Sequence, residues 1–131
     1  MAAAKVLDKM TLSNGHNLWF AMYGAADALK TYILIHGSPG NHKGFKHLSP
    51  LLVHNVNVIS LDLPGSGLTS PAAAGGIKLT EERIVEATSD FVRTLASQNP
   101  RRQFILVGHS FGGATAMQVA ARGQLESLKG L

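Results

Sequence analysis

The chain has 131 residues, 45% of them hydrophobic, with 14 glycines, a formal net charge of +4 and no cysteine. This composition suits one globular domain with a buried core, and the missing thiols exclude disulfides and cysteine-based metal sites. The basic residues are scattered without interleaved aromatic residues, so we expect no nucleic-acid binding. No apolar run approaches the roughly 20 residues that span a bilayer, and no secretory signal is recognisable. By default we expect a cytoplasmic protein.

Short, largely apolar runs predict the strands. Thr11-Leu12 and Leu18–Tyr23 flank Ser13-Asn14-Gly15, a strong hairpin signal. Further along the chain come the runs Tyr32–Ile35, Val56–Leu61 and Phe104–Val107. Continuous apolar runs without alternation are typical of parallel strands that are covered on both faces.

Helices are expected between and after these strands. Phe45–Val53 is a short candidate, and residues 81–98 form a longer one, with Thr80 as its N-cap and an end before Asn99-Pro100. A third helix is expected from Phe111 to about Arg122. The alternation predicts an α/β fold, a mostly parallel open sheet of about five strands with helices on both faces.

Three motifs follow three of the predicted strands. Residues 108–112 read Gly-His-Ser-Phe-Gly, a G-x-S-x-G pattern at the junction of a strand and a helix. A serine there lies on a sharp turn with strained backbone angles, and Gly108 and Gly112 leave room for that turn. The other two motifs are His36-Gly37-Ser38-Pro39-Gly40 and Asp62-Leu63-Pro64-Gly65-Ser66-Gly67.

In this order, each at a strand end, the three motifs resemble the Ser-nucleophile branch of the α/β-hydrolase fold superfamily (AB hydrolase-1 type), over about residues 10–131. The resemblance implies that Ser110 is the nucleophile and that the backbone N–H groups of Phe111 and Ser38 form the oxyanion hole. Relatives that open epoxides or displace halide carry aspartate at the elbow. The serine therefore favours attack on a small-molecule carbonyl: an ester, a thioester, an amide or an activated C–C bond next to a ketone.

Other motif residues are expected to be structural. Gly37 and Gly40 let the oxyanion loop approach the substrate, His36 braces this loop through hydrogen bonds, and Asp62 ties the turn at Pro64-Gly65 together. The remaining histidines show no metal-ligand spacing and are expected to face solvent; they include His16, His42, His47 and His54. We expect neither a metal nor a cofactor, since the glycine-rich segment 65–70 lacks the last glycine of a dinucleotide motif.

The resemblance also implies an acid and then a histidine later in the chain than the serine. After Ser110 the sequence holds no histidine and no aspartate, and Glu126 comes too soon after the predicted helix to be the acid. A serine without a base is a poor nucleophile, because its proton has no acceptor. We therefore expect residues 1–131 to be a single partial domain, an N-terminal half without lid, acid and histidine, and inactive alone.

The last residues, Gln124–Leu131, resemble the lead into a sixth strand. A fold truncated there would leave Phe104–Val107 as an open hydrophobic edge, through which copies could self-associate. The alternative to a hydrolase fragment is thus a non-catalytic fragment or pseudoenzyme that acts by pairing with a partner.

Overall fold

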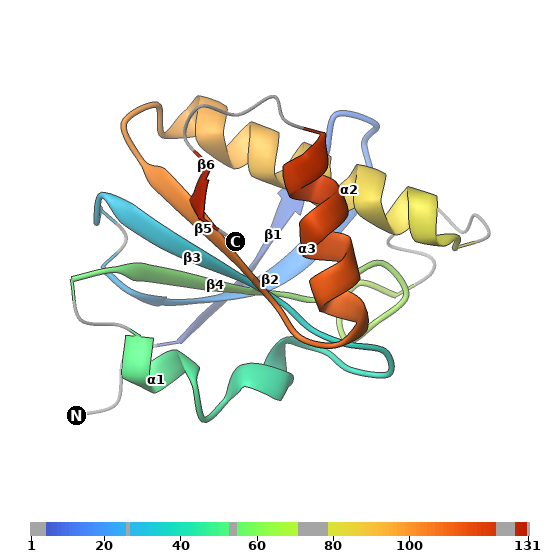
Figure 1. Ribbon diagram of the computed structural model, residues 1–131, viewed down its shortest axis with the longest axis horizontal. Coiled ribbons are helices and arrows are strands. Elements are labelled where there is room, and N and C mark those ends of the chain that lie inside the picture. The colour runs from blue at the N-terminus through green and yellow to red at the C-terminus, as the bar shows by residue number, and fades with distance from the viewer. Residues whose placement is uncertain (1–4, 26, 53–54, 71–78, 123–127, 131) are drawn as a thin grey trace.

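The protein forms one six-stranded sheet with helices on both faces (Figure 1). The computed structural model describes residues 5–25, 27–52, 55–70, 79–122 and 128–130. The strands are β1 (Val6–Thr11), β2 (Asn17–Gly24), β3 (Lys30–Ile35), β4 (Asn57–Leu61), β5 (Gln103–Gly108) and β6 (Leu128–Gly130). The helices are η1, a 3₁₀ helix (His42–Phe45), α1 (Ser49–Leu52), α2 (Glu81–Gln98) and α3 (Phe111–Ala121).

The strand order is β1-β2-β4-β3-β5-β6. β1 is antiparallel to β2, and β2 is antiparallel to β4, whereas β4, β3, β5 and β6 are parallel. The prediction of a mostly parallel α/β sheet is confirmed. Because β3 lies between β4 and β5, the chain leaves β3 and β5 toward opposite faces, and such a switch point is where ligands bind in open parallel sheets.

The two faces of the sheet have separate cores. Ile33 and Ile35 of β3 pack in the larger core, beneath α2 and α3. Leu34, between them in sequence, packs on the other face against Phe45 of η1. All three β3 side chains are fully buried. Burial on both faces explains why this strand is a continuous apolar run.

Helix α2 begins and ends where the sequence predicts. The Thr80 side chain accepts a hydrogen bond from the Arg83 N–H at 3.2 Å, which caps the first turn. On the inner side of the helix, the Phe91 ring meets the Phe20 ring of β2 edge to face, with centroids 5.5 Å apart. Such a pair adds about 1 kcal/mol to the stabilisation from burial.

The prediction of a single helix over Phe45–Val53 is wrong. Instead η1 ends at Phe45, and α1 starts only at Ser49. Pro50 explains the break, because a proline is tolerated in the first turn of a helix but not in its interior. The side chain of Asn41 caps η1 by accepting from the Lys43 N–H at 2.8 Å.

The prediction that β5 forms the open edge is also wrong in part. β6 pairs with it in parallel through Phe104↔Leu128 and Ile105↔Gly130. Among the described residues, no strand pairs with the outer side of β5 from Leu106 onward. A largely apolar cavity of about 460 Å³ lies there, between β5 and the exposed side chain of Met117 on α3.

Candidate active site

Strand register brings two of the motifs together. β3 and β5 are parallel neighbours, and Ile35, the last residue of β3, lies opposite Gly108, the last residue of β5. The His109 N–H continues this pairing by donating to the Ile35 carbonyl at 3.1 Å. The segment after Ile35 therefore lies beside the segment after Gly108, which carries Ser110.

Ser110 lies on a strained turn between β5 and α3. Its φ of 56° and ψ of −121° lie in a region of backbone angles that residues other than glycine rarely adopt. A Cβ on Gly108 would collide with the Gly112 carbonyl, and a Cβ on Gly112 would collide with the Ile35 and His36 carbonyls. The turn therefore requires glycine at both positions, and Ser110 itself remains exposed to solvent.

The two expected oxyanion donors flank this serine. Ser38 directly follows Gly37, and Gly37 lies close to the serine. A Cβ added to Gly37 would be only 3.2 Å from the Ser110 Cβ. Phe111 begins α3, where the first N–H groups of a helix have no partner within the helix. Neither the Ser38 nor the Phe111 N–H donates to another described residue. A cavity of about 270 Å³ is lined by Ser110, the His36–Gly40 loop, Gly44, Phe45 and His109.

His36 links its own loop, residues 36–40, to the segment after β4. Its Nε2 accepts a hydrogen bond from the Leu63 N–H at 3.0 Å, so the proton of the neutral ring lies on Nδ1, which donates to the Gly37 carbonyl at 2.7 Å. Burial lowers the pKa of His36, and the nearby His42 lowers it further. These effects outweigh the hydrogen bond to Gly37 and the charge of Asp62, which raise the pKa.

Folding stability should therefore depend on the protonation of His36. As the pH falls below about 6.5, the ordinary pKa of histidine, the unfolded chain takes up a proton that folded His36 resists, so the free energy of unfolding decreases. The loss continues until the lower folded pKa is passed. In His36→Gln the amide oxygen can still accept from Leu63, and we expect a shallower slope between pH 8 and pH 5 in urea unfolding. Identical slopes for both proteins would contradict this account.

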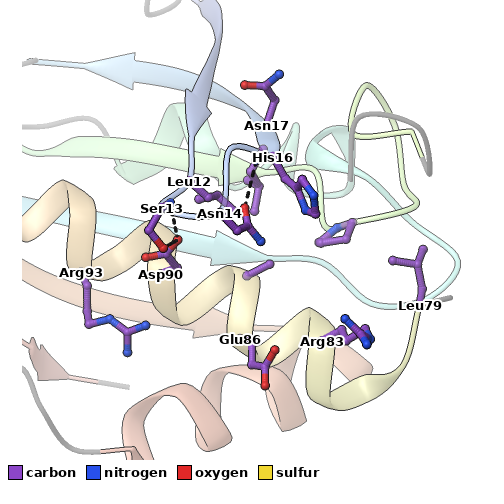
Figure 2. A pocket seen from close by; sticks show the side chains of 13 residues that line it. Leu12, Ser13, Asn14, His16, Asn17, Leu79, Arg83, Glu86, Asp90 and Arg93 are labelled. Atoms are coloured by element: carbon purple, nitrogen blue, oxygen red, sulfur yellow. Dashed lines mark hydrogen bonds between the residues drawn. The ribbon is translucent and has the colours of Figure 1, made fainter. Parts of the chain in front are cut away.

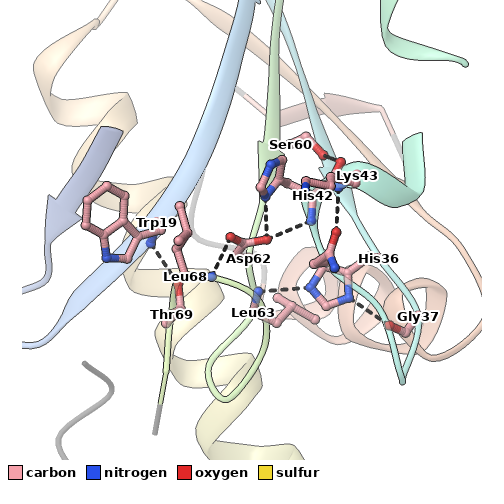
Figure 3. A network of polar contacts seen from close by, with 11 residues as sticks. Trp19, His36, Gly37, His42, Lys43, Ser60, Asp62, Leu63, Leu68 and Thr69 are labelled. Carbon is pink, nitrogen blue, oxygen red and sulfur yellow. Dashed lines mark hydrogen bonds and ion pairs between the residues drawn. The ribbon is translucent and has the colours of Figure 1, made fainter. Parts of the chain in front are cut away.

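Asp62 is the centre of a buried polar network (Figure 3). It is fully buried, and its Oδ1 accepts from the N–H and Nδ1 of His42 at 2.7 and 2.8 Å, while its Oδ2 accepts from the Leu68 N–H at 2.9 Å. Asp62 thus holds η1 as well as its own loop. The expectation that His42 faces solvent is wrong, because its side chain is only 5% exposed. No motif in the sequence points to His42; only its place between the motifs at His36 and Asp62 could have done so.

Another cavity of about 270 Å³ lies between the β1–β2 hairpin and α2, away from Ser110 (Figure 2). At its edge Asp90 accepts hydrogen bonds from the N–H and the hydroxyl of Ser13, both at 2.8 Å.

Glu126 and His54 lie outside the described residues. Within the described ranges, no group of three or more histidine, aspartate or glutamate side chains is arranged to hold a metal ion. Nor is any helix there long and apolar enough to cross a membrane.

Comparisons with known proteins identify relatives and solved structures that are similar to this chain. The chain is 27% identical to an uncharacterised hydrolase of Saccharomyces cerevisiae, over 87% of this chain and 38% of that protein. It is 34% identical to the uncharacterised protein YfhR of Escherichia coli, over 92% of this chain and 43% of that protein. A Pyrococcus furiosus esterase has the same fold, with a TM-score of 0.76 at 15% identity, covering 96% of this chain and 49% of that chain.

The chain thus spans about two fifths of the length of these two curated relatives. Residues 32–129 match the family model described as alpha/beta hydrolase family. This range includes the strand-end motifs and the turn at Ser110. The protein belongs to the alpha/beta hydrolase family.

Proposed function

We propose that these 131 residues carry the nucleophile and the oxyanion hole of a serine hydrolase. The observation that carries this proposal is the backbone of Ser110, whose strained angles hold its side chain exposed at the rim of a cavity. The N–H groups of Ser38 and Phe111 are free to bind an anion beside it. Strain of this kind persists in proteins mainly at functional sites.

The chemistry follows from these groups. The Ser110 hydroxyl oxygen attacks a carbonyl carbon, and the electrons of the C=O double bond move to its oxygen, which accepts from the N–H groups of Ser38 and Phe111. A general base takes the hydroxyl proton and later returns it to the leaving group; the family resemblance implies a histidine in this role. Loss of one oxyanion donor typically costs about 10²–10³ in rate. We propose a small-molecule ester, thioester, amide or activated C–C bond next to a ketone as substrate.

We expect a fluorophosphonate probe to label Ser110 slowly, because no base among the described residues accepts a hydrogen bond from the Ser110 hydroxyl. Added imidazole should increase the labelling rate several-fold by acting as an external base. Ser110→Ala should abolish labelling, and His109→Ala, at the same cavity, should retain it. Labelling is measured by mass spectrometry of the intact protein. A folded sample that never reacts, even with imidazole, would rule out a reactive serine and favour the non-catalytic alternative.

The outer side of β5 from Leu106 onward has no strand partner among the described residues, which supports a second candidate, association with a second copy of this chain. Two such edges can pair with each other, because antiparallel pairing of identical strands is self-complementary under a two-fold axis. We propose that the edge from Leu106 to Gly108 and the neighbouring Met117 form this contact.

We expect Met117→Glu to lower the dimer fraction in sedimentation velocity, because it places a charge beside the apolar edge. Leu51→Glu is the matched control, since Leu51 is also a largely exposed apolar side chain, on α1 at the other face of the sheet. A protein that is monomeric at all concentrations, or equal effects of the two variants, would contradict this contact.

A further inference from the structure

The loop that carries Ser38 is held at both ends by histidines. His36, before the loop, accepts from the Leu63 N–H at 3.0 Å. His42, after the loop, donates to Asp62 through its N–H and its Nδ1, at 2.7 and 2.8 Å. Leu63 and Asp62 are neighbours in the segment after β4 (Figure 3). Both ends of the loop are therefore tied to the same point of the sheet.

We propose that His42 is a positioning residue, which holds the Ser38 N–H where an oxyanion would form. His42 does not line the cavity at Ser110, so it acts through the loop and not on the substrate. This inference rests on the proposed function, because it gives Ser38 a role toward the substrate.

The contact between His42 and Asp62 is suited to fixing the backbone. One carboxylate oxygen receives both bonds from the same residue, and neither side chain is open to solvent. Hydrogen bonds to a charged acceptor are about twice as strong as neutral ones. The Ser60 hydroxyl of β4 also donates to the His42 carbonyl at 2.9 Å. Both backbone polar groups of His42 are thus anchored at the carboxyl end of β4.

The surroundings of the other ring nitrogen of His42 favour a role in hydrogen bonding over a role in packing. Nε2 is buried and has no hydrogen-bond partner among the described residues. A buried polar nitrogen without a partner is unfavourable for folding, so an apolar ring of similar size would pack there without that cost. The bond from Nδ1 to Asp62 is what such a ring cannot supply. A histidine at this position therefore serves the orientation of the loop.

The test compares three variants. His42→Phe keeps a buried ring and removes the donor to Asp62. His42→Asn restores a donor, because the amide nitrogen of asparagine lies about where Nδ1 of histidine does. His47→Phe is the matched control, since His47 is an exposed histidine in the same segment. The readouts are the rate of fluorophosphonate labelling of Ser110 with imidazole present, and amide hydrogen exchange at Gly37, Ser38 and Gly40.

We expect His42→Phe to slow labelling by about 10- to 100-fold, because a small displacement of a catalytic donor has an effect of this size. Exchange at the Ser38 amide should become faster, while amides of β5 keep their protection. His42→Asn should restore labelling to within about threefold of the wild type, and His47→Phe should change neither readout.

Each failure has a separate meaning. If the probe labels the wild type and labels His42→Phe equally fast, the positioning role of His42 is overturned and the proposed function stands. An asparagine variant as slow as the phenylalanine variant also overturns the role, since ring packing alone would then matter. If the wild type never labels, the proposed function fails, and Ser38 exchange alone decides whether His42 holds the loop. Should His42→Phe not fold, Ser60→Ala replaces it, with a several-fold loss expected and no change overturning the role.

Discussion

Replacement of Gly112 by alanine should destabilise the fold by about 3 kcal/mol or more. The added Cβ would collide with the carbonyl oxygens of Ile35 and His36. Ile35 is fully buried and lies opposite Gly108 in the parallel pairing of β3 with β5. Relief of the collision would require α3 to move away from β3, or the end of this central strand to shift. We also expect labelling of Ser110 to be lost, because the same shift separates Ser38 from the serine.

Gly113→Ala is the matched control for this prediction. A Cβ on Gly113 would lie 3.6 Å from the nearest atom, the Gly108 carbonyl oxygen, which is ordinary van der Waals contact. Alanine is favoured over glycine inside a helix by about 1 kcal/mol, so this variant should be as stable as the wild type or slightly more stable. Urea unfolding followed by circular dichroism measures both. Equal stability of the two variants would show that the turn does not need the space at Gly112.

The strands and the turn at Ser110 were predictable because each depends on local chemistry. A strand buried on both faces must be apolar throughout, as Ile33–Ile35 is, and a tight strand-to-helix turn must have small residues at Gly108 and Gly112. The Thr80 cap and Asn99-Pro100 likewise mark the ends of α2 through local hydrogen bonding and backbone restriction.

The polar network behind the loop of residues 36–40 was not predictable in the same way. His42 and Asp62 are 20 residues apart, and they meet only because β3 and β4 are neighbours in the sheet. Their contact depends on tertiary structure, and a lone histidine in a polar loop gives no sign of it. Similarly, β6 is only three residues long, so its pairing with β5 depends on proximity and not on a strand pattern.

Removal of the Asp62 carboxylate should also have a large effect. In Asp62→Ala the N–H and Nδ1 of His42 and the N–H of Leu68 lose their acceptor. Removal of one partner from a buried charged contact typically costs about 3–5 kcal/mol, because the groups left behind are cut off from water. We expect a loss of this size in the free energy of unfolding, and faster amide exchange at both His42 and Leu68.

Asp90→Ala is the control for Asp62→Ala, because it also removes a carboxylate that accepts several hydrogen bonds, but at a site open to water. Asp90 also accepts two bonds from one residue, the N–H and hydroxyl of Ser13, but at an exposed site where water can replace the carboxylate. We therefore expect this variant to lose only about 1 kcal/mol or less. A loss as large as that of Asp62→Ala, which removes three bonds at a buried site, would mean that burial does not set the cost. The difference between the two variants thus measures how much the burial of the Asp62 contacts adds to the stability of the fold.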